Sequence, residues 1–191
     1  MGKIVLIRHG ESTANRERHF TLTDDVPLTD AGRRQAREAS VHVTARFKPA
    51  AVLCSHFARA RETGEIIAAS LGMNVRIFEG IHERHFGCLR GQPYARYDEL
   101  ADAGPEAHLH WAPPGGESRS DLQRRVMPAL GEIVAGYPDE EVLVVCHGAV
   151  IQSVWAHLSG MWDGAPVPVN CGMVLVEHRG MKLGLPEMLV G

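Results

Sequence analysis

Two hydrophobic segments that lie far apart in the sequence each run into a His-Gly pair. The residues concerned are Arg8, His9 and Gly10 after residues 4–7, and His147 and Gly148 after residues 142–146. An imidazole can attack phosphorus, and a guanidinium can hold phosphate oxygens through paired hydrogen bonds. Because ligands of open α/β sheets bind at the carboxyl ends of strands, we predict that the two ends form one site for phosphate chemistry.

Two further side chains suit the same reaction. Arg59 follows the apolar run 51–54 and lies in the first turn of the next expected helix, which places a second guanidinium at a strand end. A departing alkoxide needs a proton, and Glu83, in the loop after residues 75–78, is the best candidate acid. Glu11 is the second candidate, although it better suits a role in ordering its own loop.

The elements that would position these side chains alternate between strands and helices. Short runs rich in Val, Ile and Leu predict buried strands at residues 3–7, 51–54, 75–78, 142–146 and 173–177. Helix patterns begin at Thr29 and Asp30, near Ala58, at Ser120, and at residue 149. This alternation predicts an α/β fold with a mostly parallel sheet and helices on both faces.

The helix that is expected to begin at Ser120 carries two local signals. Ser120 and Gln123 match a capping box, and Pro128 is expected to kink the helix or to move its start. The preceding residues 103–118 are rich in Pro and Gly at their end and are expected to form a loop. Arg125, on the same helix, is expected to face water.

Composition and charge limit the possible partners. The chain has 191 residues, of which 45% are hydrophobic and 23% charged, and this predicts a single domain over residues 1–191. A formal charge of −3 gives no general attraction to nucleic acid or to a membrane surface, so an anion must be bound locally. Four widely spaced cysteines are expected to be reduced thiols, and we expect a cytoplasmic protein without a membrane span.

Several segments together resemble the motifs of the histidine phosphatase superfamily, the phosphoglycerate mutase-like proteins. The matching residues are Arg8-His9-Gly10-Glu11-Ser12 with Asn15, Pro27-Leu28-Thr29 with Gly32, Ser55 with Arg59-Ala60 and Thr63, residues 83–91, and His147-Gly148. They occur in the order found in the family and span nearly the whole chain. His56-Phe57 replaces the Pro-Leu pair that is usual after the serine.

The resemblance implies a three-layer α/β/α sandwich and a covalent phosphohistidine on His9. It further implies that Arg8, Arg59 and His147 bind the phosphoryl group, that Asn15 assists them, and that Glu83 acts as acid and then as base. No metal and no cofactor are expected. The remaining expected contacts with phosphate or substrate are Gly148, Ser12, Thr21 and Tyr94.

Three departures from the family pattern favour a phosphatase over a mutase. Thr21-Leu22-Thr23 stands where many members have a Gly-Trp or similar pair, and Tyr94 stands where the phosphoglycerate mutases have a lysine. Residues 92–117 are too few to hold the longer insertion with paired arginines found in those mutases. The missing cations are those expected to hold a second anionic group of the substrate.

The favoured function is therefore a metal-independent phosphomonoesterase of the histidine acid phosphatase type, which acts on a small phosphorylated metabolite. One alternative is a mutase that is phosphorylated by a bisphosphate cofactor, and another is a phosphate-binding or regulatory protein without turnover. A protein phosphatase that acts on phosphohistidine is a further variant, although such enzymes usually lack an acid at the position of Glu83. Whether the chain forms a homodimer is left open.

Substrate selectivity is assigned to loops 16–26 and 88–117. Their notable side chains are Phe20, Tyr94, Arg96, Tyr97 and Trp111. An aromatic and modestly basic mouth suits a phosphorylated sugar, a nucleotide or a cofactor precursor equally well. His108 and His110 lie in the second of these loops and are expected at the surface or in a lid rather than around a metal ion.

Overall fold

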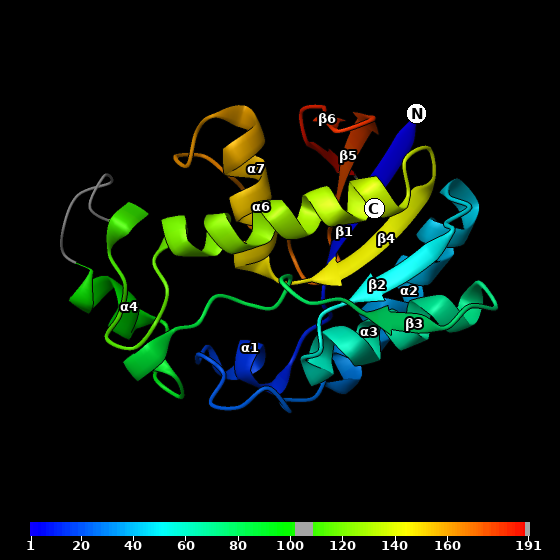
Figure 1. Ribbon diagram of the computed structural model, residues 1–191. Helices are drawn as coiled ribbons and strands as arrows, with labels where there is room; N and C mark the ends of the chain where they lie inside the picture. The colour runs from blue at the N-terminus through cyan, green and yellow to red at the C-terminus, as the bar shows by residue number, and fades with distance from the viewer. Residues whose placement is uncertain (102–108, 190–191) are drawn as a thin grey trace.

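A seven-stranded sheet forms the middle layer of the computed structural model, which describes residues 1–101 and 109–189 (Figure 1). The strands are β1 Gly2–Arg8, β2 Ala51–Cys54, β3 Val75–Ile77, β4 Glu141–Cys146, β5 Met173–Arg179, β6 Lys182–Leu183 and β7 Glu187–Leu189. Their order is β3-β2-β4-β1-β5-β6, and β7 pairs with β5. Strands β3, β2, β4 and β1 are parallel, whereas β5 pairs antiparallel with β1, β6 and β7.

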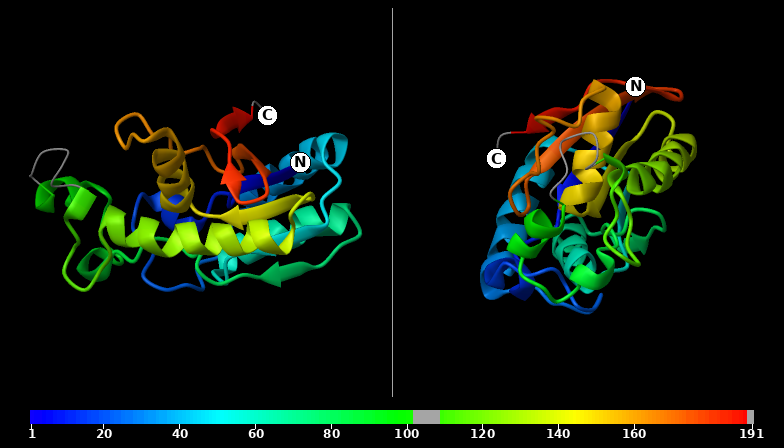
Figure 2. Two further views of the ribbon diagram at one scale, coloured as in Figure 1. Left: turned by 45° about the horizontal axis from the view of Figure 1, so that its top comes forward. Right: turned by 90° about the vertical axis from the view of Figure 1, so that its left-hand side faces the viewer.

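Helices cover both faces of this sheet, as Figure 2 shows from two further directions. They are α1 Thr13–Glu17, α2 Asp30–Arg46, α3 Ala58–Ser70, α4 Ala95–Leu100, α6 Arg119–Gly136 and α7 Gly148–Ser159, with a 3-10 turn at Gly87–Leu89. Residues of α2 and α3 pack in one hydrophobic core, and residues of α6 and α7 pack in the other. The predicted three-layer α/β/α arrangement is confirmed.

Strand β1 shows why residues 4–7 are all apolar and do not alternate with polar residues. Ile4 and Leu6 point into the core beneath α6 and α7, whereas Val5 and Ile7 point into the core beneath α2 and α3. Successive side chains of a strand point to opposite faces, so a strand covered on both faces must be apolar at every position. These four side chains are all at most 1% exposed.

The parallel pairing of β1 with β4 brings the two His-Gly pairs together. Arg8 is the register partner of Cys146, so His9 and His147 each leave the sheet one residue later at the same edge. The His9 amide continues the ladder and donates to the carbonyl of Cys146 at 3.0 Å. The prediction that the two strand ends lie together is confirmed.

The start of α6 differs from the prediction. The helix is capped by Ser118, whose hydroxyl accepts from the amide of Asp121, while the Asp121 carboxylate accepts from the amide of Ser118. The capping box therefore lies two residues before the expected pair of Ser120 and Gln123, since a carboxylate in the first turn also suits the helix dipole. The helix continues through Pro128 to its end at Gly136.

Several short elements have no counterpart in the prediction. These are α1, α4, the 3-10 turn, β6 and β7, each of seven residues or fewer. His108 and most of the first half of the expected loop 103–118 lie outside the described residues. All four cysteines are free thiols, and Cys54, Cys146 and Cys171 are buried. Among the described helices, none is long and apolar enough to cross a membrane.

Gly10 illustrates how tightly the strand end packs against α2. A Cβ atom at this position would lie 2.5 Å from the carbonyl oxygen of Gly32, which belongs to the backbone of α2. The Gly10 amide also donates to the Thr63 hydroxyl of α3 at 3.0 Å. A side chain at residue 10 would therefore push apart the strand end and the helix that hold His9.

We predict that Gly10→Ala lowers the free energy of unfolding by about 1–3 kcal/mol, because rigid backbone atoms have to move to admit the methyl group. Urea denaturation monitored by circular dichroism measures the change. Gly136→Ala is the matched control, since its Cβ would meet no atom within 4 Å. It should leave stability unchanged or raise it by about 0.4–1 kcal/mol. Equal stabilities of the two variants would contradict the steric explanation.

Candidate active site

His9 lies at the carboxyl end of β1, and both of its ring nitrogens have assigned partners. Nδ1 lies 2.7 Å from the carbonyl oxygen of Gly10, which can only accept, so Nδ1 carries the proton. Nε2 lies 3.1 Å from Nε of Arg59, which can only donate, so Nε2 carries the lone pair. The hydrogen bonds therefore select the tautomer in which Nε2 holds the lone pair that a nucleophile would need.

Burial and neighbouring charge both keep His9 neutral. Its side chain is 2% exposed, and this desolvation is the main cause that lowers the pKa of His9 well below 6.5. The positive charges of Arg59 and Arg8 lower it further, against the opposing hydrogen bond to Gly10. The imidazole is consequently unprotonated at neutral pH, as a nucleophile must be.

His147 packs against His9 but reaches less far toward solvent. The two ring centroids are 5.2 Å apart in an edge contact, and His147 is fully buried. Its Nε2 lies 2.9 Å from the Ser55 hydroxyl, and its Nδ1 has no hydrogen-bond partner among the described residues. Burial, and then the charge of Arg59, lowers the pKa of His147 well below 6.5.

Two guanidinium groups converge beside the His9 ring. Arg59, in the first turn of α3, is 2% exposed, and Arg8 donates from Nη1 to the carbonyl of Pro168 at 2.6 Å. Buried polar atoms are normally hydrogen-bonded, yet Nε of Arg8 and Nη1 of Arg59 have no partner within the described part of the chain. Two such donors near Nε2 of His9 suit an anionic ligand.

The first turn of α7 adds backbone donors to the same place. The helix begins at Gly148, and its N-cap residue, His147, forms no side-chain capping bond. Gly148 and Ala149 line the site cavity, so the positive end of the helix dipole faces it. A Cβ at Gly148 would lie 2.8 Å from Val167, and the absence of a side chain keeps this wall close to Arg8.

Glu83 brings a carboxyl group into the same cavity, beside the first turn of α7. Its Oε1 accepts from the amide of Arg84 at 2.9 Å, and the Ala149 amide also bonds its carboxylate. Burial raises the pKa of Glu83 above 4.5, although Arg59, Arg8 and these amides act in the opposite direction. The group therefore holds its proton to a higher pH than an exposed carboxyl.

The cavity formed by these groups has a volume of about 390 Å³. Eight of the ten residues assigned to the site from the sequence line it, namely Arg8, His9, Asn15, Thr21, Arg59, Glu83, Tyr94 and Gly148. Ser12 and His147 do not. The volume suits a small metabolite.

Ser12 and Asn15 form the capping box of α1 beside the cavity. Ser12 is fully buried and caps α1 through a capping box with Asn15, so its hydroxyl is used by the helix end. Asn15 Nδ2 donates to the Tyr94 hydroxyl at 3.1 Å, and its Oδ1 accepts from Asn170 at 3.2 Å. The structure thus places Asn15 and Tyr94 as a hydrogen-bonded pair in the cavity wall.

The residues assigned to selectivity divide into two groups. Phe20, Tyr94 and Tyr97 line the cavity, and Phe20 packs on Tyr94 with centroids 4.9 Å apart. Arg96 instead pairs with Glu99 on the exposed side of α4. Trp111 lies outside the cavity lining and packs edge-on against Tyr97 at 5.3 Å.

Arg125 does not face water as expected. It pairs with Glu117, and it donates to the carbonyl oxygens of Gly80 at 2.8 Å and His82 at 3.1 Å. The periodicity of the helix could not reveal this role. The partners of Arg125 are carbonyl oxygens of an irregular loop, whose path the sequence pattern does not predict.

Arg84 was not singled out from the sequence, although it follows Glu83 directly. It is 6% exposed and donates to the Glu117 carbonyl, the Tyr97 hydroxyl and the Trp111 carbonyl. Together with Arg125 it fixes the loop that carries Glu83.

Other residues that line the cavity were not assigned to the site from the sequence, among them Asp98, Arg119, Gln152, Trp162 and Val167. The guanidinium of Arg119 lies over the Trp162 ring, 5.6 Å from its centroid, and adds a fourth arginine to the wall beside Arg8, Arg59 and Arg84. Its position in the first turn of α6, the helix whose start was misplaced, is the signal that could have found it.

Comparisons with known proteins identify the family. The model of the histidine phosphatase superfamily (branch 1) matches residues 4–185. The chain therefore belongs to the histidine phosphatase superfamily.

Relatives in sequence carry two kinds of name. A protein of Arabidopsis thaliana named phosphoglycerate mutase-like protein 4 is 36% identical over 162 residues, which cover 80% of this chain and 69% of that one. Glucosyl-3-phosphoglycerate phosphatase of Mycolicibacterium vanbaalenii is 32% identical over 172 residues, covering 83% and 75%. Three mycobacterial relatives, each 33% identical, are matched over only 41% of their length.

Solved structures of similar shape include a mycobacterial glucosyl-3-phosphoglycerate phosphatase in complex with VO3, with a TM-score of 0.85 and 27% identity. The match covers 99% of this chain and 98% of that one. YhfR of Bacillus stearothermophilus has a TM-score of 0.84 at 28% identity, covering 100% and 96%.

The two buried neutral histidines predict a loss of stability in acid. The folded-state pKa of His9 and of His147 lies below 6.5, so below this pH the unfolded chain binds more protons than the folded one. The free energy of unfolding should fall as the pH drops from 7 to 5. Each histidine should contribute up to about 1.4 kcal/mol per pH unit.

Urea denaturation at several pH values measures this slope. His147→Gln should make it shallower, and His9→Gln should do the same. His157→Gln is the control, because His157 is exposed on α7 and should leave the slope unchanged. Identical slopes in all four proteins would contradict the explanation.

Proposed function

We propose that the protein is a metal-independent phosphomonoesterase that hydrolyses a small phosphorylated metabolite through a phosphohistidine on His9. The observation that carries this proposal is the tautomer of His9. Its Nε2 lone pair is held in a cavity beside Arg59, while Nδ1 is fixed on the Gly10 carbonyl. The acceptor nitrogen of His9 thus lies in a cavity whose wall also carries the cations that a phosphoryl group needs.

The proposed first step forms a bond between His9 Nε2 and phosphorus as the bond to the ester oxygen breaks. Glu83 gives its proton to the departing alkoxide. Arg8 and Arg59 stabilise charge on the equatorial phosphoryl oxygens, which is the larger part of catalysis in phosphoryl transfer. His147 supports the His9 ring from the buried side, where it makes its edge contact.

In the second step water attacks the phosphorus and Glu83 takes up its proton. The bond between nitrogen and phosphorus breaks, phosphate leaves, and both His9 and Glu83 return to their starting states. The names of the relatives support a phosphatase, and glucosyl-3-phosphoglycerate phosphatase among them favours a phosphorylated sugar derivative with a further acidic group. Arg119 in the cavity wall suits such a group.

A phosphoglycerate mutase-type phosphotransferase is the second candidate, because the Arabidopsis relative carries that name. Tyr94 argues against it, since its hydroxyl bonds Asn15 and it supplies no cation. A panel of phosphorylated metabolites, assayed for phosphate release with and without chelator beside a mutase assay, separates the two. Phosphate release that survives chelation supports the proposal, and release abolished by chelation would overturn its metal independence.

Replacement of His9 by Ala should lower kcat by at least about 1000-fold, because no other described group can form the covalent bond. Rapid acid-free quenching with ³²P-labelled substrate should trap a labelled protein in the wild type and none in His9→Ala. A labelled His9→Ala protein would show that the nucleophile lies elsewhere.

Glu83→Gln should distinguish substrates by their leaving groups. Alkyl phosphates need a proton on the departing oxygen, so their kcat should fall by about 100- to 10,000-fold, whereas p-nitrophenyl phosphate should lose far less. Glu132→Gln, on the exposed side of α6, is the control and should affect neither. Equal losses for both substrates would contradict the acid role.

A further inference from the structure

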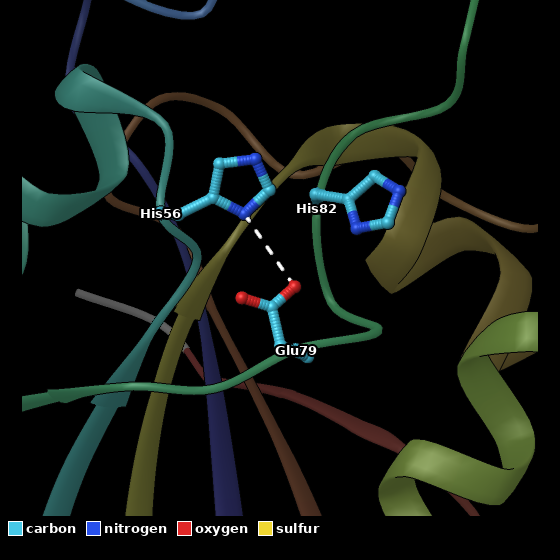
Figure 3. A group of neighbouring side chains, drawn as sticks. All are labelled: His56, Glu79 and His82. Atoms are coloured by element: carbon cyan, nitrogen blue, oxygen red, sulfur yellow. Dashed lines mark ion pairs between the residues drawn. The ribbon is translucent and has the colours of Figure 1, made fainter.

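A second cluster of potential ligands lies outside the cavity, at the carboxyl ends of β2 and β3. His56, Glu79 and His82 each place one ligand atom within 4.8 Å of the others (Figure 3). The two strands are parallel, and Cys54 is the register partner of Ile77. Residues two beyond each strand end, His56 and Glu79, therefore meet at one edge of the sheet, and the loop returns His82 to the same place.

Both imidazoles turn a nitrogen toward the Glu79 carboxylate. Nδ1 of His56 lies 3.9 Å from Oε2 of Glu79, and Figure 3 shows the His82 ring beside the same carboxylate. Nδ1 of His56 and Nδ1 of His82 are both buried atoms without a hydrogen-bond partner among the described residues. Two unsatisfied imidazole nitrogens around one carboxylate form a set of ligands that suits a transition-metal ion.

We propose that His56, Glu79 and His82 form a binding site for a divalent transition-metal ion of the Zn²⁺ type. Two imidazoles and one carboxylate are ligands that Zn²⁺ accepts, and a water molecule completes the usual set of four. Ligands at about 2.1 Å around a tetrahedral ion lie about 3.4 Å from one another. The three ligand atoms lie at most 4.8 Å apart, so each pair has to approach by no more than about 1.4 Å through rotation of the exposed Glu79 side chain and of the two imidazoles.

The surroundings hold this site in place and limit its role. Arg125 binds the carbonyl oxygens of Gly80 and His82, which fixes the loop backbone, and its own charge is already paired with Glu117. None of the three ligands lines the catalytic cavity. The bound ion is therefore a structural clamp on the loop that carries Glu83, and the phosphoryl transfer proceeds without it.

Isothermal titration of chelator-treated protein with Zn²⁺ tests the site directly. The wild type should bind one ion per chain, and Mg²⁺, which prefers oxygen ligands, should show no binding. Thermal unfolding should shift upward with Zn²⁺, because a ligand that binds only the folded state stabilises it. Co²⁺ should give the visible absorption of a tetrahedral site.

Three variants separate this site from adventitious binding. Loss of an outer-shell partner typically costs 10- to 100-fold in metal affinity, so His56→Gln and His82→Gln should each cost at least about 100-fold. Glu79→Gln should weaken binding by at least about tenfold. His157→Gln is the control and should bind as the wild type does.

His56→Gln and Glu79→Gln change groups that are not fully buried, so they keep the test informative even if His82→Gln does not fold. Zinc affinity equal to that of the wild type in both variants, or an absence of stoichiometric binding in the wild type, would overturn the proposal. Phosphate release by chelated protein tests the phosphatase separately, so either proposal can fail alone.

Discussion

The parallel pairing of β1 with β4 is the constraint on which the rest of the site depends. Its register sets Arg8 beside Cys146, so the two following histidines emerge as neighbours with ring centroids 5.2 Å apart. A shift of one residue would exchange the side chains that pack in the two cores, because the side-chain period of a strand is two, and would lose the fitted packing on both faces. The hydrophobic cores on both faces thus fix the position of the reactive nitrogen.

The sheet and its main helices follow from patterns that are local in the sequence. Residues 4–7 and 142–145 are apolar at every position because both faces of the strands are covered, and Thr29 caps α2 through a bond to the amide of Gly32. Short edge strands such as β6 carry no such signal. The start of α6 was misplaced because two serines, Ser118 and Ser120, both precede an acceptor three residues later.

The parts of the site that the sequence could not supply depend on contacts between distant segments. In the sequence, Arg125 resembles any exposed helical arginine. Only the structure shows that residues 80–83 pack against it and accept its hydrogen bonds. The pKa values of His9 and Glu83 likewise depend on burial, which moves them in opposite directions, downward for the imidazole and upward for the carboxyl. Motif order identified these residues, whereas their protonation states required the three-dimensional arrangement.

The segment that carries Glu83 has neither helix nor strand between residues 78 and 86. Arg84 and Arg125 instead hold it through main-chain carbonyl oxygens, including those of Glu117 and Gly80. Every residue type offers such an oxygen, so substitutions along the segment at positions other than Arg84 keep the carbonyl groups that Arg125 binds. The segment that carries Glu83 can consequently change in sequence during evolution, and so adapt to new leaving groups, while the strand end that carries His9 stays the same.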